Sequence, residues 1–207
     1  MIGGRKLRVT NMKPSATAVY RMLLMQVDSV INARNMKVIA FTSVFHYEEK
    51  SEYVCNVAKS MVLEGKKVLV VDCNIDNPKI PRYFGIEMIT FLSEEKVHND
   101  CSQTIFEVPE IPKLNFVLSW LGLRGSGGIL DFEKIASFIE KTKEEYDIIL
   151  IDSPPAGIDA EGVKLSVIAD GTIIIVQSGK TPKASAKRMK EMLESVNVTV
   201  LGVILGH

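Results

Sequence analysis

The sequence predicts an α/β domain in which a doubly wound, mostly parallel sheet carries helices on both faces. The first observation is a series of short, continuous Val, Ile and Leu runs, which are typical of strands buried on both faces. The second is that amphipathic segments separate these runs, as the crossovers of a parallel sheet require. The third is that two of the runs end in aspartate, at Asp72 and Asp152, and ligands of such sheets bind where strands end.

The elements follow one another in a regular order. The predicted strands are 37–42, 67–72, 114–118, 147–151, 172–177 and 198–205. The predicted helices are 16–33, 49–64, 131–143 and 182–195. Gly65 is a natural stop for the second helix, and Asp131 can cap the start of the third.

Length and composition indicate one domain. The 207 residues and the 46% hydrophobic content suit a single core over 15–207, preceded by a polar, basic arm over 1–14. Lys plus Arg and Asp plus Glu both number 25, so the chain lacks the excess positive charge that nonspecific nucleic-acid binding requires. We therefore expect no nucleic-acid partner.

The cysteines and the apolar segments indicate the compartment. Cys55, Cys73 and Cys101 fit no zinc or disulfide spacing, which favours isolated thiols in a reducing cytoplasm. The start of the chain contains no signal peptide, and no apolar run reaches the ~18 residues that span a bilayer. We expect a cytoplasmic protein that inserts into no membrane and reaches one only through a partner.

The loop after the first strand ends in Lys50-Ser51 and leads into a helix. A strand, a loop ending in Lys-Ser and a helix form the layout of a P-loop. The dipeptide alone is a weak signal, but Asp72 and Asp152 strengthen it. A P-loop protein places its Mg²⁺-side carboxylate where an apolar strand ends, and two such aspartates in this order favour a nucleotide site over two unrelated turn caps.

Further short motifs continue this pattern. They are Asn56-Val57-Ala58, Gly65 to Asp72, Pro78, Phe84-Gly85, Tyr146-Asp147, Ile151 to Pro155, Asp170-Gly171, Ser178 to Thr181 and Leu201-Gly202-Val203. Together, from about Pro14 to Leu205, the chain resembles the cytoplasmic domain of bacterial tyrosine kinases (BY-kinases) of capsule and exopolysaccharide synthesis, relatives of the MinD/ParA ATPases. The resemblance implies that Lys50 contacts phosphates, that Ser51 binds Mg²⁺, and that Asp72 and Asp152 position Mg²⁺ and activate the nucleophile.

The loop itself departs from the P-loop pattern. Val44 and Glu49 stand where the general pattern has glycines, and His46-Tyr47 replaces a Pro-Gly of the BY-kinases. Glycine is needed there because the backbone takes unusual φ and ψ and its N–H groups must touch the phosphates. Tyr47 and Glu49 are therefore expected to block the position of the nucleotide.

Charge adds to this obstruction. A carboxylate about 4 Å from one phosphate charge costs about 4 kcal/mol at an effective dielectric of about 20. That is roughly a thousandfold in affinity, and Glu48 adds a second acid. Even after a discount for solvent, micromolar binding would become nearly millimolar. We expect no cofactor, or at most weak ATP or ADP with Mg²⁺ held through Ser51, Asp72 and Asp152.

Other nucleotide positions are also altered. The second aspartate of the family's pair is Asn74, the arginine that follows is Asp76, and the asparagine that contacts adenine aligns with Gly206. Glu48, Glu49 and Glu52 would lie at the start of a helix, where acids favour the helix dipole. Two explanations remain: either the protein supplies its own anion in place of ATP, or the loop drifted after function was lost.

The first predicted helix carries apolar groups on more than one face. Its main face is formed by Tyr20, Leu23, Leu24, Val27 and Ile31. The other apolar residues, which include Met22 and Met25, indicate either a helix buried on two sides or a contact with another protein.

The resemblance bears on this helix as well. The family's Glu-x-x-Arg-x-x-Arg, whose charges join protomers in a ring, is matched by Ala18, Arg21 and Leu24. We therefore expect the ring contact to be weakened, and Met22, Leu24 and Met25 to offer an adaptable apolar face instead. The isolated chain is predicted to be a monomer or a homodimer.

These observations favour a catalytically degenerate BY-kinase-like protein. It would act as a regulatory or scaffolding subunit in capsular or exopolysaccharide synthesis or export. Its expected partners are a membrane chain-length regulator, an active kinase paralogue, or both. One alternative is an active ATP-dependent tyrosine kinase or ATPase with an unusual loop, and a second is a MinD/ParA-like positioning ATPase.

Overall fold

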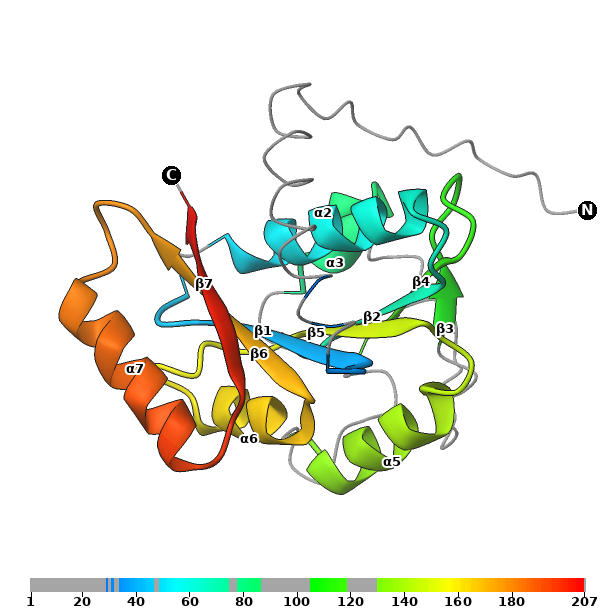
Figure 1. Cartoon of the computed structure of the whole chain (residues 1–207). Helices are drawn as coiled ribbons and strands as arrows, with labels where there is room; N and C mark the ends of the chain where they lie inside the picture. The colour runs from blue at the N-terminus through cyan, green and yellow to red at the C-terminus, as the bar shows by residue number, and fades with distance from the viewer. Residues whose placement is uncertain are drawn as a thin grey trace, which may run out of the picture.

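A seven-stranded sheet forms the centre of the molecule (Figure 1). The computed structural model describes residues 29, 31, 34–46, 49–74, 78–86, 105–118 and 130–206. The strands are β1 (Val38–Ser43), β2 (Val68–Asp72), β3 (Ile105–Glu107), β4 (Leu114–Leu118), β5 (Ile148–Asp152), β6 (Gly171–Gln177) and β7 (Val200–Gly206). Their order is β3-β4-β2-β5-β1-β6-β7, and every neighbouring pair is parallel except β3 and β4.

Helices cover both faces of the sheet (Figure 1). They are α2 (Lys50–Leu63), α3 (Ile80–Tyr83), α5 (Phe132–Thr142), α6 (Ala160–Ile168) and α7 (Lys183–Ser195). In Figure 1, α2 and α3 lie above the sheet, and α5, α6 and α7 lie below it. No helix in these ranges is long and apolar enough to cross a membrane.

Alternation along the strands divides the core between the two faces. Ile39 and Phe41 of β1 pack in the cluster that contains Val54, Val57 and Met61 of α2. Val38 and Ala40 of the same strand instead pack with residues of α5 and α6. Successive strand residues point to opposite faces, so a strand covered on both sides must be apolar throughout. This explains why the strands appear in the sequence as continuous apolar runs.

The predicted fold class is confirmed. Each predicted strand is present within two residues of its expected bounds, as are the helices expected at 49–64, 131–143 and 182–195. The antiparallel β3 and the helices α3 and α6 were not predicted. Of the helix expected at 16–33, only Ser29 and Ile31 are described, and both are helical. The rest of that helix and the arm 1–14 lie outside the described residues.

The connections place β5 between β1 and β2. The chain leaves β1, forms α2 and enters β2, but β1 and β2 do not pair with each other. The strand β5 lies between them and pairs with both. Since all three strands are parallel, their carboxyl ends lie at the same edge of the sheet. Residues that directly follow or end these strands are therefore neighbours, although they are far apart in the sequence.

At the other edge of the sheet, Asp170 holds the start of β1. Its Oδ2 atom accepts hydrogen bonds from the backbone N–H groups of Lys37 and Val38, both at 2.8 Å. We predict that Asp170→Ala lowers the free energy of unfolding by about 1–3 kcal/mol, because both donors lose a charged acceptor. Urea unfolding measures this change. Glu140→Ala, at an exposed residue of α5, is the control, and an equal loss in both variants would contradict this role of Asp170.

Candidate nucleotide-binding site

The carboxyl edge of β1, β2 and β5 brings the predicted site residues together. Asp72 ends β2 and is the register partner of Asp152, which ends β5 and is in turn the register partner of Phe41 in β1. The two aspartates therefore end adjacent parallel strands, and neighbouring strands are spaced about 4.8 Å apart. The loop that follows β1 leads to Lys50 and Ser51 in the first turn of α2, directly above them.

Lys50 and Ser51 both bind Asp152. The Nζ atom of Lys50 forms an ion pair with Oδ1 of Asp152, and Oγ of Ser51 donates a hydrogen bond to Oδ2 at 2.6 Å. The three residues are almost completely buried, with exposed fractions of 4%, 3% and 0%. A single carboxylate thus accepts from both the cation and the hydroxyl that a P-loop protein directs at phosphate and Mg²⁺.

Asp72 is the second buried carboxylate of the cluster. Its Oδ1 accepts a hydrogen bond from the backbone N–H of Asn74 at 3.0 Å, and its Oδ2 accepts one from Ile80 at 3.4 Å. Burial raises the pKa of Asp72 from its ordinary value of 3.8 to about 6, although these N–H groups and the charge of Lys50 act in the opposite direction. Burial also lowers the pKa of Lys50, and Asp72 opposes that change.

The end of β1 and the start of the loop pack against the chain that leaves β5. Oγ1 of Thr42 donates to the carbonyl of Pro154 at 3.0 Å and accepts from the N–H of Ala156 at 2.9 Å. Gly157 lies so close to the loop that a Cβ atom there would come within 2.4 Å of the carbonyl oxygen of Val44. A side chain at residue 157 would therefore push the two loops apart.

Val44 does not obstruct a ligand. This residue stands at the first glycine position of the P-loop pattern, but its side chain is buried in an apolar cluster with Ile174 of β6 and Met189 and Leu193 of α7. Its substitution for glycine is therefore accommodated by the core below the loop. Of the two glycine positions of the pattern, only the second, Glu49, presents an exposed side chain.

Glu49 is the residue before the first turn of α2. It is exposed, and its side chain makes no capping hydrogen bond to the helix. Glu52 lies in the first turn, where burial and the neighbouring charge of Glu49 raise its pKa. Glu49 and Glu52 thus lie at the start of α2, as expected, but the anion that binds Lys50 is Asp152.

Tyr53 was missed by the sequence analysis. Gly206, which the resemblance aligns with an adenine-contacting asparagine, ends β7 next to the Tyr53 side chain of α2. A Cβ atom on Gly206 would lie 2.7 Å from Oη of Tyr53. The tyrosine thus fills the space into which an asparagine side chain would extend. Only a contact between residues distant in sequence reveals this, and no local pattern around Tyr53 predicts it.

The structure describes five of the predicted site residues. Lys50, Ser51, Asp72 and Asp152 form the buried cluster, and Glu49 lies at its exposed rim. The predicted blocking residues Tyr47 and Glu48 lie outside the described part of the chain. So do the residues of the predicted interaction helix, which are Arg21, Met22, Leu24 and Met25.

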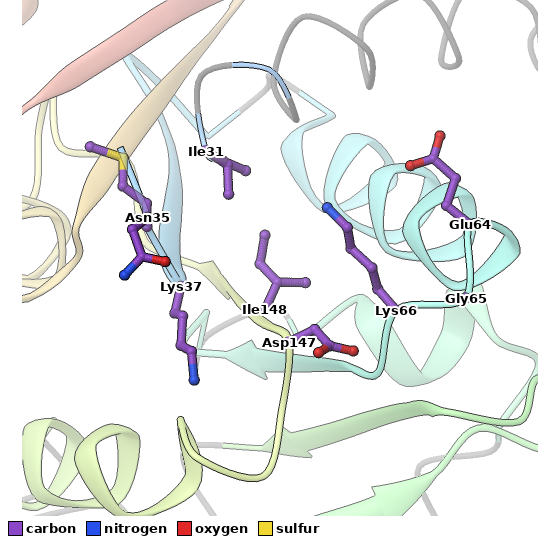
Figure 2. A pocket seen from close by; sticks show the side chains of 9 residues that line it. Ile31, Asn35, Lys37, Glu64, Gly65, Lys66, Asp147 and Ile148 are labelled. Carbon is purple, nitrogen blue, oxygen red and sulfur yellow. The ribbon is translucent and has the colours of Figure 1, made fainter. Parts of the chain in front are cut away.

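A cavity of about 400 Å³ lies at the opposite edge of the sheet (Figure 2). The apolar side chains of Ile31 and Ile148 face one another across it, and Lys66 and Asp147 line its polar side. Oδ2 of Asp147 accepts a hydrogen bond from the N–H of Lys67 at 2.7 Å, so this carboxylate holds a loop. The cavity shares no residue with the cluster around Asp152.

The raised pKa of Asp72 predicts a pH-dependent stability. The pKa of Asp72 is higher in the folded protein than in the unfolded chain, so at a pH between these two values the folded protein binds one more proton. The protonated carboxyl favours the folded state, and this contribution to the free energy of unfolding is lost as the pH rises through about 6. Asp72→Asn removes this loss. We expect the stability of the variant relative to the natural protein to increase by about 1.4 kcal/mol between about pH 5 and about pH 8.

Urea unfolding at the two pH values measures this difference. Glu140→Gln, on an exposed turn of α5, controls for general charge effects. A relative stability of Asp72→Asn that stays constant or falls with rising pH would contradict the assignment.

Comparisons with known proteins agree with this geometry. The family model described as ParA, NUBPL iron-transfer P-loop NTPase, matches residues 49–205. Tyrosine-protein kinase YwqD of Bacillus subtilis (strain 168) is 25% identical over 199 residues, which cover 96% of this chain and 84% of that protein. Tyrosine-protein kinase CpsD of Streptococcus agalactiae is 26% identical over 179 residues, which cover 84% and 76% of the two chains.

Solved structures show the same fold. The kinase domain of the Escherichia coli tyrosine kinase ETK superposes with a TM-score of 0.80 at 16% identity, covering 99% of this chain and 82% of that one. The MinD cell division protein of Aquifex aeolicus gives a TM-score of 0.64 at 25% identity, with coverages of 82% and 68%. Since the family model matches most of the chain and the fold agrees, this protein belongs to the ParA family of P-loop NTPases, with BY-kinase domains and MinD among its structural neighbours.

Proposed function

We propose that this protein is a catalytically inactive relative of the BY-kinases that acts as a regulatory or scaffolding subunit in capsular or exopolysaccharide synthesis or export. The observation that supports this most directly is that Lys50 and Ser51 are both bonded to Asp152 inside the protein. The residues that would receive phosphate and Mg²⁺ already have an internal anion as their partner.

Nucleotide binding would have to displace this arrangement. Leaving one charge of a buried pair without its partner costs about 3–5 kcal/mol, and a phosphate at Lys50 would recover the cost for the lysine but not for Asp152. The loop offers little in return, because it has no glycine to bring its N–H groups to a phosphate. The exposed carboxylate of Glu49 would instead face the incoming anion.

The residues suit Mg²⁺ better than they suit a nucleotide. Asp72, Asp152 and Ser51 supply the carboxylate and hydroxyl oxygens that Mg²⁺ prefers. However, Mg²⁺ in sites of this kind is held largely through the phosphates of the substrate, so without them the ion is bound weakly. At the base end, Tyr53 occupies the space beside Gly206. We therefore assign no reaction step to bound nucleotide, and any ATP or ADP is held weakly.

The proposed partners follow from the relatives. Several similar proteins are named tyrosine-protein kinases, and one similar structure is the chimerical protein CapA2B2. A chain that keeps the kinase fold and lacks catalysis would compete for, or stabilise, the contacts of an active paralogue. We propose a membrane chain-length regulator, an active kinase paralogue, or both as partners, which would bring this protein from the cytoplasm to the membrane.

Two other functions have some support. An active tyrosine kinase or ATPase is favoured by the convergence of Lys50, Ser51, Asp72 and Asp152 at one edge of the sheet. A MinD/ParA-like positioning ATPase is favoured by the matching family model and the superposition on MinD. Both require ATP to bind and turn over, so one binding measurement separates them from the proposal.

We predict that the purified full chain binds Mg-ATP and Mg-ADP no more tightly than about millimolar, because Lys50 is held by Asp152 and the loop lacks glycine. Isothermal titration calorimetry measures the affinity, and release of phosphate measures turnover. Lys50→Ala sets the background for both. A micromolar affinity that depends on Lys50, or a nucleotide retained through purification, would contradict the proposal.

We further predict that the site can be partly restored. The substitutions Tyr47→Gly and Glu49→Gly return glycines to the loop, and Asn74→Asp returns the second carboxylate of the family pair. The triple variant is expected to bind Mg-ATP at least about tenfold more tightly than the natural protein. Adding Lys50→Ala to the triple variant should abolish the gain, which ties it to the loop.

A folded triple variant with no gain would show that the loop does not limit binding. The next variant then adds Gly206→Asn together with Tyr53→Ala, because an asparagine at residue 206 needs the space that Tyr53 fills. If binding appears only at that stage, the base end rather than the loop limits affinity.

A further inference from the structure

The outer edge of β7 is open in the described part of the chain. β7 is the last strand of the sheet and pairs only with β6 (Figure 1, red strand). Val203 and Leu205 are 52% and 55% exposed, which is unusual for large apolar residues in a strand. On the other face of the strand, a Cβ atom on Gly202 would meet nothing within 4 Å.

The pairing with β6 determines which backbone groups point outward. The N–H of Ser178 donates to the carbonyl of Gly206 at 2.7 Å, so the backbone groups of Gly206 face β6. Backbone direction alternates along a strand, and those of Ile204 and Gly202 therefore face β6 as well. The N–H and C=O groups of Val203 and Leu205 point away from the sheet, beside the two exposed side chains.

The edge lacks the features that usually prevent strands from pairing with other chains. Such edges are normally short, charged, interrupted by proline or twisted away by a bulge. β7 has seven residues, Val-Leu-Gly-Val-Ile-Leu-Gly, with no charge and no proline. Its one irregularity lies next to Thr172 and Ile173, before the exposed half of the strand. The half from Val203 onward is a regular, uncharged and apolar edge.

We propose that β7 pairs antiparallel with β7 of a second copy of this chain, about a two-fold axis at Ile204. In this register Val203 of one copy lies opposite Leu205 of the other, and each such pair exchanges both of its backbone hydrogen bonds. The outward-facing groups of both strands are then satisfied. The exposed side chains of Val203 and Leu205 pack beside one another on the same face, and Ile204 meets its own copy at the axis.

The lack of charge on β7 favours a second copy over another partner. An isologous contact requires a surface that is complementary to itself. Here the two residues with outward-facing backbone groups lie on either side of one central residue, so the same register satisfies both copies. Like charges directly opposite one another destabilise strand pairs, and β7 contains none. Pairing through β7 is expected whether or not the site around Asp152 binds nucleotide.

Sedimentation velocity of the full chain tests the proposal. At a concentration of about 100 μM, the natural protein is expected to sediment as a dimer. Val203→Lys combined with Leu205→Lys should weaken the dimer at least about tenfold, because each lysine would lie opposite another. Leu63→Lys is the matched control, since Leu63 is an exposed apolar residue of α2, 82% accessible, and its variant should remain dimeric.

A cross-link tests the register itself. In a Cys101→Ser background, Ile204→Cys should form a disulfide-linked dimer under mild oxidation, because residues that face each other at this type of pair have Cα atoms about 4.5 Å apart. Gly202→Cys should not, because its opposite residue is Gly206 of the other copy. A monomeric natural protein would overturn the proposal. So would a dimer insensitive to the lysine pair, or a cross-link from Gly202→Cys in the absence of one from Ile204→Cys.

Discussion

The buried ion pair between Lys50 and Asp152 joins the beginning of α2 to the end of β5. It exists because β5 lies between β1 and β2, which puts its last residue directly under the first turn of the helix that follows β1. A lysine buried without a partner would lose its charge or destabilise the fold. The ion pair with Asp152 thus helps to hold the first turn of α2 in its place over the sheet.

The loops around this pair are held by short polar contacts. Thr42 joins the end of β1 to Pro154 and Ala156, and Oγ of Ser153 donates to the carbonyl of Phe41 at 2.9 Å. These bonds fix the two strand exits against each other before any ligand is considered. A P-loop protein uses such rigidity to present phosphate-binding groups. In this chain the same rigidity holds a set of groups that are bonded to one another.

The sequence predicted the sheet because its strands are apolar on both faces. It also predicted Lys50, Ser51, Asp72 and Asp152 as one site, because the carboxyl ends of parallel strands meet at one edge. The short elements β3 and α3 were not predicted, because so few residues show no clear hydrophobic periodicity. The helix α6 was not predicted either, because it contains Gly162 and its apolar residues do not form a single face.

Other features depend on the arrangement of the strands in space, which local patterns do not contain. That Lys50 turns toward Asp152 follows from the position of β5 between β1 and β2. The contact of Tyr53 with Gly206 joins α2 to β7 across β1 and β6. The sequence pattern placed Glu49 and Glu52 at the start of α2, but it could not show that an aspartate much later in the chain binds the lysine.

The most direct test of this account is the nuclear magnetic resonance signal of the Lys50 ammonium group in nitrogen-15-labelled protein, identified by its loss in Lys50→Arg. An ammonium group that is buried against Asp152 should give a signal protected from exchange with water, which saturating Mg-ATP leaves unchanged. A signal that is unprotected, or that moves when Mg-ATP is added, would contradict the claim that an internal carboxylate takes the place of phosphate at this lysine.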